Sequence, residues 1–256
     1  YAVPLQTDSG DDNAVFSIEF LTDGQVYFDQ AHLRPVGEPH LNRHMDDFIG
    51  SMRVPTMRFP GGSISGVYDW RKGTGPVHLR PSLPDPVFKW RIDYDYGIEE
   101  YLDQCLRLGM RPFLTVNIGS GTPEAAGELA AYCESWHRER GLEPPTAYFM
   151  IGNEEYGSWE PGHMDAAMYV EALRLFAPAI RARYSSPRII AFGTEESEAA
   201  PGREATPLRE RVLREAQGLF DVLAIHRYWT GWSYRPAEQI GYSVAGVESI
   251  RRDLAG

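Results

Sequence analysis

An Asn-Glu pair at the end of an apolar run is the stretch of this chain best suited to chemistry. Residues 148–151 are largely apolar and lead directly into Gly152, Asn153 and Glu154. This pattern predicts a buried parallel strand, and in a (β/α) barrel the chemistry takes place at the carboxyl ends of the strands. The Asn153 amide could hold a sugar hydroxyl while the Glu154 carboxyl protonates a departing oxygen, as glycosidic bond cleavage requires. The alternative is that Glu154 and Glu155 are solvated loop acids.

A second candidate is Arg58, which stands on the predicted strand 54–59 just before the Pro-Gly-Gly turn at 60–62. A buried arginine is costly without a carboxylate partner, and active-site acids are natural partners. The glycines would let the backbone turn tightly beside a ligand. The alternative is an interface arginine next to a purely structural turn.

Other predicted strands also end in polar residues. The strands 112–117 and 221–226 end at Asn117 and His226. One polar side chain per strand end would converge on a single point above a barrel. Trp70, in the loop that follows the Pro-Gly-Gly turn, could wall such a cleft, although a loop tryptophan is also often a packing residue.

Apolar patterning predicts an alternation of strands and helices from residue 54 onward, which is typical of a parallel sheet with helical crossovers. Helices are predicted at 41–50, 98–108, 123–140, 166–184, 206–217 and 243–254, and strands at 54–59, 112–117, 146–151, 188–193 and 221–226. A closed barrel needs eight strands, so five indicate either an open sheet or part of a barrel. Residues 13–36 read instead as a β-hairpin from an antiparallel module.

The composition favours a globular protein with an uncharged partner. The 256 residues carry a net charge of −11, which disfavours nucleic acid. The 6 Trp and 14 Tyr could stack on sugar rings, although most of them are expected in the core. No apolar run approaches the roughly 18 residues of a membrane span. No signal peptide is visible, and the compartment is left open.

No metal or cofactor site is predicted. The histidines form no metal-ligand pattern, and His40 and His44 are expected to be solvated. Neither a phosphate-binding loop nor a serine nucleophile elbow is present. Cys105 and Cys133 fall within predicted helices, so we expect two buried thiols rather than a disulfide.

Taken together and in order, these motifs resemble glycoside hydrolase family 51, the retaining α-L-arabinofuranosidases of clan A, which have a (β/α)8 barrel. The matching stretches are residues 58–62, 68–70, 75–76, 80–81, 97–101, 116–122, 151–157 and 226–228. Residues 28–35 resemble the end of the sandwich module that precedes the barrel in larger members. We therefore predict a β-rich segment over 1–36 and a partial TIM-barrel catalytic domain over 37–256.

The resemblance implies a role for each matching residue. Glu154 corresponds to the general acid/base that follows barrel strand four, and Asn153 to a ligand of a sugar hydroxyl. Arg58 corresponds to an arginine that supports the site, and Tyr228 to a tyrosine near the nucleophile. Where the family often has an asparagine that binds the sugar, this chain has Ser63, which leaves the identity of the sugar open.

The resemblance also implies that the nucleophile lies elsewhere. The five predicted strands correspond to barrel strands two to six, whereas the family nucleophile is a glutamate at the end of strand seven. A retaining enzyme needs its second carboxyl about 5–5.5 Å from the first. Glu195 and Glu196 are the internal candidates, but they follow the strand next to that of Glu154 and are expected to be loop acids. We expect this chain to be part of a larger enzyme, completed by a further segment or a second chain.

Three functions remain open at this point. The first is removal of terminal α-L-arabinofuranosyl residues from oligo- or polysaccharides. The second is another clan A glycosidase such as a xylosidase, which Ser63 favours. The third is a non-catalytic carbohydrate-binding barrel protein, which the missing nucleophile favours. In each case the expected partner is a carbohydrate.

Overall fold

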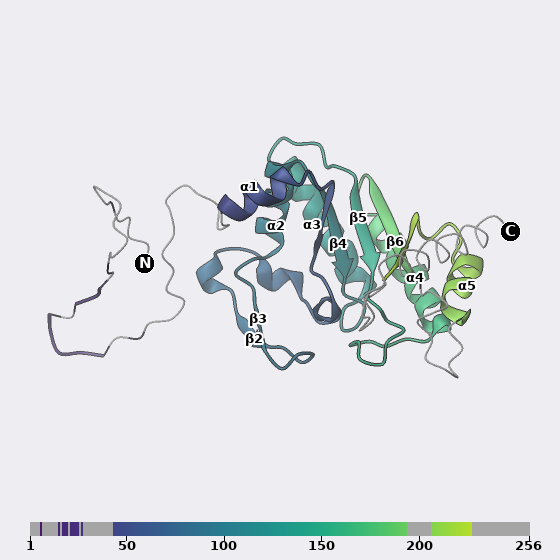
Figure 1. Ribbon diagram of the computed structural model, residues 1–256, viewed down its shortest axis with the longest axis horizontal. Coiled ribbons are helices and arrows are strands. Elements are labelled where there is room, and N and C mark those ends of the chain that lie inside the picture. Colours follow the sequence, from purple (N-terminus) through teal and green to yellow (C-terminus); the bar gives the residue numbers. More distant parts are fainter. Residues whose placement is uncertain are drawn as a thin grey trace, which may run out of the picture.

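The computed structural model describes residues 43–193 and 206–226, with a few residues before them (6, 15, 17–19, 21–25 and 27). Its centre is a five-stranded parallel sheet in the order β1-β4-β5-β6-β7, and each strand pairs with the next one of this series. Helices cross over between successive strands, and the sheet curls as part of a barrel (Figure 1). The predicted incomplete (β/α) barrel is confirmed.

The elements follow the predicted alternation closely. The sheet strands are β1 (Thr56–Phe59), β4 (Arg111–Val116), β5 (Ala147–Ile151), β6 (Pro187–Gly193) and β7 (Val222–Ile225). The helices are α1 (Arg43–Ser51), α2 (Ile98–Leu108), α3 (Pro123–Arg138), α4 (Ala166–Arg181) and α5 (Thr206–Glu215). Five predicted strands and five predicted helices are thus confirmed, with ends that differ by a few residues.

The two faces of the sheet differ in their burial near the start of β4 and β5, although farther along these strands both faces are buried. Leu114 and Ile151 are buried in the main hydrophobic core, into which the helices also pack. Phe113 and Tyr148 are only partly buried, and their rings lie 6.2 Å apart on neighbouring strands. Because side chains alternate along a strand, Arg58 shares this second face, with its guanidinium 6.0 Å from the Phe113 ring.

Local sequence signals account for the helix ends. Thr122 and Asp165 accept hydrogen bonds from backbone N–H groups in the first turns of α3 and α4. Pro123 is the first residue of α3, where a missing N–H costs nothing. Gly109 ends α2 in the left-handed conformation at φ 67°, which favours glycine. The predicted buried thiols are confirmed, since Cys105 and Cys133 are free and lie inside α2 and α3.

The sequence predicts a long loop between β1 and α2. This prediction is wrong in detail, because the segment contains regular structure. It holds three 3₁₀ helices and the antiparallel pair β2–β3, which stands apart from the main sheet (Figure 1). These are η1 (Ser63–Gly66), η2 (Trp70–Gly73), η3 (Val77–Leu79), β2 (Ser82–Pro84) and β3 (Arg91–Asp93). Arg80 ties the segment to α2: it is buried and donates to both carboxylate oxygens of Glu100, at 2.7 and 2.8 Å. A buried ion pair of this kind cannot be recognised from local sequence.

Some predictions concern residues that lie largely or wholly outside the described ranges. The hairpin over 13–36 lies largely outside the described residues, and residues 17–19 within it are exposed and form no strand. The helix over 243–254 lies wholly outside the described residues, as do Glu195 and Glu196. The two-module division at residue 36 therefore stays a prediction. Among the described residues, no helix has the length and apolar character to cross a membrane.

Candidate active site

The residue at the centre of the site is Glu154, three positions after the end of β5. Gly152 and Glu154 both have positive φ, at 78° and 55°. A positive φ is uncommon for a residue other than glycine, and such strained positions are often found at functional sites. The Gly157 N–H donates to the Glu154 carbonyl at 2.7 Å and closes this tight turn. The Glu154 side chain is buried at 6% exposure, so it is not the solvated loop acid of the alternative interpretation.

His226 supplies a polar contact to the Glu154 carboxyl. Its Nδ1 lies 2.7 Å from Glu154 Oε1. The imidazole comes from the residue after β7, two strands away from β5 in the sheet. Phe192 of β6 lies between them and meets the His226 ring edge-on, with centroids 4.8 Å apart. Three adjacent strands thus fix this pair.

Arg58 orients the Asn153 amide from the other side. Its Nη2 donates to Asn153 Oδ1 at 2.5 Å, and its Nε donates to Thr115 Oγ1 at 2.8 Å. The strands that carry these residues, β1, β4 and β5, are neighbours in the sheet. Asn153 is buried at 3% exposure, so its amide oxygen needs such a donor.

A further carboxyl, that of Glu160, lies on the other end of the same amide. Glu160 Oε1 accepts from Asn153 Nδ2 at 3.2 Å and from Ser63 Oγ at 2.7 Å. Burial raises the pKa of Glu160, the Ser63 hydrogen bond opposes this, and the charge of Glu154 adds to the rise. The pKa of Glu160 therefore depends on the charge of Glu154, and the same carboxyl holds Asn153.

The neighbouring acid, Glu155, points into the protein rather than toward a ligand. It is 2% exposed, and its Oε1 accepts from the Asn153 backbone N–H at 3.0 Å. Burial raises its pKa to about 7, the bond from Asn153 opposes this, and the charge of Glu160 adds to it. Its other oxygen, Oε2, is buried with no hydrogen-bond partner among the described residues. Glu155 is thus a carboxyl that favours its neutral form below about pH 7 in the folded protein.

Together these residues have the groups that an acid/base site needs, and their role in catalysis stays a prediction. A buried carboxyl beside an imidazole can give up and take back a proton. An amide held at both ends can bind a hydroxyl group in a fixed direction. The set consists of two hydrogen-bonded groups, which meet at the adjacent residues Asn153 and Glu154: Glu154 with His226, and Asn153 with Arg58, Thr115, Glu160 and Ser63.

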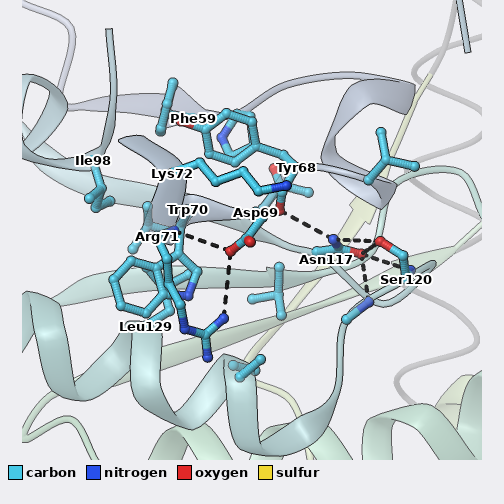
Figure 2. A pocket seen from close by; sticks show the side chains of 18 of the residues that line it. Phe59, Tyr68, Asp69, Trp70, Arg71, Lys72, Ile98, Asn117, Ser120 and Leu129 are labelled. Atoms are coloured by element: carbon cyan, nitrogen blue, oxygen red, sulfur yellow. Dashed lines mark hydrogen bonds and ion pairs between the residues drawn. The ribbon is translucent and has the colours of Figure 1, made fainter. Parts of the chain in front are cut away.

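Asn117 follows β4 and makes its contacts with its own loop and with the segment between β1 and α2. Its Nδ2 donates to the Tyr68 carbonyl at 3.2 Å and to Ser120 Oγ at 3.0 Å. Its Oδ1 accepts from the N–H groups of Ser120 and Gly121, at 3.0 and 3.1 Å (Figure 2). These contacts give Asn117 a structural task, and its part in substrate binding stays a prediction.

Trp70 lies near α3, next to a cavity of about 490 Å³ that Figure 2 shows. Its ring packs 5.0 Å from Tyr132, and the Arg71 guanidinium lies 5.0 Å from its face. Trp70 and Asn117 line the cavity, but Asn153, Glu154 and His226 do not. Trp70 is therefore a packing residue here, and a contact with sugar stays a prediction.

Two members of the set, Thr115 and Glu160, escaped prediction from the sequence. Thr115 carried a usable signal, because it is a polar residue in phase with Phe113 on an otherwise apolar strand. Glu160 carried none, since no motif marks it. Tyr228 lies outside the described residues. No group of three or more His, Cys, Asp or Glu residues suited to a metal ion is present in the described part.

Comparison with known proteins shows which family this chain resembles. Residues 48–235 match the family model described as the alpha-L-arabinofuranosidase 1 domain. This range contains every residue of the set described above.

Characterised relatives agree with this match. Alpha-L-arabinofuranosidase C of Emericella nidulans is 28% identical over 202 residues, which are 73% of this chain and 40% of the relative. An intracellular exo-alpha-(1->5)-L-arabinofuranosidase of Halalkalibacterium halodurans is 27% identical over 219 residues, 81% of this chain and 43% of the relative. The chain thus spans less than half the length of these relatives.

Solved structures extend the comparison to the fold. A GH51 alpha-L-arabinofuranosidase from Thermotoga petrophila superposes with a TM-score of 0.67 at 26% identity, over 84% of this chain and 47% of that one. A family 51 alpha-L-arabinofuranosidase from Bifidobacterium longum gives a TM-score of 0.71 at 22% identity, over 89% and 46%. At the lower identity the likeness concerns the fold alone.

Proposed function

Because the chain belongs to the alpha-L-arabinofuranosidase 1 domain family, we propose that the protein removes terminal α-L-arabinofuranosyl residues from oligo- or polysaccharides. The observation that supports this best is the environment of Glu154. Its buried carboxyl contacts His226, and the adjacent Asn153 amide is held by Arg58. The proposed general acid and an amide oriented to bind a sugar hydroxyl are thereby adjacent.

In the proposed mechanism Glu154 works twice. Its carboxyl first donates a proton to the glycosidic oxygen while a carboxylate nucleophile attacks the anomeric carbon, so that the leaving group departs as an alcohol. The Glu154 carboxylate then takes a proton from water, which attacks the same carbon and releases the nucleophile. His226 keeps the carboxyl in place through both steps.

The nucleophile is the part of the mechanism that the described residues leave open. Glu155 and Glu160 are the nearest acids in sequence, but both already accept hydrogen bonds that hold Asn153. We therefore assign neither of them this role. The resemblance to family 51 attributes it to a glutamate at the end of a seventh barrel strand, and the proposal keeps that attribution.

The test is the Glu154→Gln variant of the native full-length protein. Glutamine cannot donate a proton to the leaving group, so hydrolysis of substrates with poor leaving groups should fall by about 10²- to 10⁴-fold. Aryl arabinofuranosides with a good leaving group, such as 4-nitrophenyl, should lose much less. Glu143→Gln is the control, since that side chain is 90% exposed on the surface. Equal losses on both substrates would refute the role of Glu154.

A different sugar is the second candidate, and Ser63 favours it. Ser63 points its hydroxyl at Glu160 within the same set of residues, where the family often has a longer amide side chain. A shorter side chain alters which hydroxyl positions can be reached. A panel of aryl glycosides that includes α-L-arabinofuranoside and β-D-xyloside would separate the two. Sugar binding by calorimetry without turnover of any of them would instead indicate a non-catalytic binding protein.

A further inference from the structure

We propose that Glu160 is a positioning residue that determines how Asn153 and Ser63 present themselves to the sugar, an inference that rests on the proposed function. One oxygen of Glu160, Oε1, accepts hydrogen bonds from both side chains, at 3.2 Å from Asn153 Nδ2 and 2.7 Å from Ser63 Oγ. Ser63 follows β1 and Asn153 follows β5, and these residues are 90 positions apart. Glu160 therefore joins two sugar-facing candidates from distant parts of the chain.

The direction of the Asn153 amide follows from its two partners. Arg58 donates to its oxygen and Glu160 accepts from its nitrogen, so the two ends cannot exchange. A primary amide has two N–H donors and two acceptor positions. One N–H and one acceptor position are thereby used, which leaves one of each for a ligand.

Ser63 is fixed in the same way. Its O–H donates to Glu160, so its oxygen can only accept from a ligand. The remaining Asn153 N–H and the Ser63 oxygen are then a donor and an acceptor on two groups that share Glu160 Oε1 as a partner. A sugar hydroxyl both accepts and donates, and it fits such a pair.

Burial makes Glu160 an effective anchor. Its side chain is 6% exposed, and its backbone is held by bonds with Gly157 and His163, at 3.1 Å each. An exposed acid would exchange these contacts for water. Loss of this carboxyl would let the Asn153 amide rotate about its last bond and would leave the Ser63 hydroxyl free to turn.

The experiment measures kcat/KM for wild type, Glu160→Ala and Glu160→Gln on an aryl α-L-arabinofuranoside and its monodeoxy analogues. We expect Glu160→Ala to lose about tenfold or more on the parent substrate, equivalent to one lost hydrogen bond in the transition state. On the analogue that lacks the hydroxyl read by Asn153 and Ser63, the loss should shrink to less than about threefold. Glu160→Gln keeps an acceptor oxygen and should restore most of the activity.

A merely structural role predicts a different pattern. It would lower activity on all analogues alike, and that result would overturn the proposal, as would a Glu160→Ala variant with unchanged kcat/KM on the parent substrate. Melting temperatures of each variant, with Glu143→Ala as the matched surface control, show whether folding accounts for a loss.

Failure of the proposed function gives its own signature. If the wild type hydrolyses a different aryl glycoside, the deoxy series is repeated with that sugar. If the wild type hydrolyses no aryl glycoside, calorimetry compares how wild type and Glu160→Ala bind L-arabinose, D-xylose and their deoxy forms. Equal weakening of all sugars by Glu160→Ala, or no sugar binding by the wild type, would overturn the assignment of Glu160.

Discussion

His226 and Glu154 are 72 residues apart in sequence, yet His226 Nδ1 lies 2.7 Å from Glu154 Oε1. The contact spans three strands of the sheet, because β6 lies between β5 and β7, and Phe192 of β6 packs against the imidazole. The contact fixes the position of the acid.

The first prediction concerns His226. Replacement by alanine removes a polar partner from a buried carboxyl, so kcat should fall by about ten- to a hundredfold with a smaller change in KM. Replacement by asparagine places an amide near the former Nδ1 position and should recover part of the loss. Steady-state kinetics on an aryl α-L-arabinofuranoside test this, with the exposed His78 changed to alanine as the control. Equal kinetics for His226→Ala and wild type would contradict the role.

The second prediction concerns Arg58. Its guanidinium donates in two directions at once, to Thr115 and to Asn153, which a lysine ammonium on a flexible stem does not reproduce. Arg58→Lys should therefore lower kcat/KM by about tenfold or more even though the charge is kept. The exposed Arg111 of β4, changed to lysine, is the matched control and should change little. A lysine variant with full activity would show that charge alone matters at this position.

Sequence patterning was sufficient for most of the fold. Apolar runs predict the five parallel strands, and the Gly-Asn-Glu at the end of one of them indicates Glu154, which the structure buries beside His226. Arg58 was recognised because a charged residue on an apolar strand needs a partner.

The remainder depended on contacts between residues far apart in the chain. Glu160 meets Ser63 across 97 positions, and neither residue sits in a pattern that suggests the other. The ordered segment between β1 and α2 was missed for the same reason, because the buried Arg80–Glu100 pair that holds it is set by tertiary packing. Trp70 packs on Tyr132, and its contact with a sugar stays a prediction.

The third prediction separates two roles for Asn117. Its hydrogen bonds hold residues 117–121 and the Tyr68 carbonyl, so Asn117→Ala should lower the free energy of unfolding by about 1–3 kcal/mol. The same variant should keep kcat/KM within about threefold at temperatures where it is folded. Denaturant unfolding and kinetics test both parts. A rise in KM of about tenfold with unchanged stability would instead support the sugar-binding role predicted from the sequence.

The fourth prediction is a pH dependence of stability that arises from Glu155. Burial raises its pKa from the ordinary 4.5 to about 7, so between these values the folded protein holds a proton that the unfolded chain has released. The stabilisation is complete below about pH 4.5, falls as pH rises towards about 7, and is lost above it. At about 1.4 kcal/mol per pKa unit, the total change is roughly 3 kcal/mol.

Glu155→Gln tests this contribution directly. Glutamine stays neutral at every pH, so the variant should lose less stability than wild type between about pH 4.5 and 7. Denaturant unfolding at a series of pH values measures the difference, and the exposed Glu143 changed to glutamine serves as the control. Because the Glu155 carboxyl accepts from the Asn153 N–H, the amide oxygen of glutamine should preserve that bond and leave Asn153 in place. Parallel pH profiles for wild type and Glu155→Gln would show that this carboxyl does not stay neutral in the folded protein.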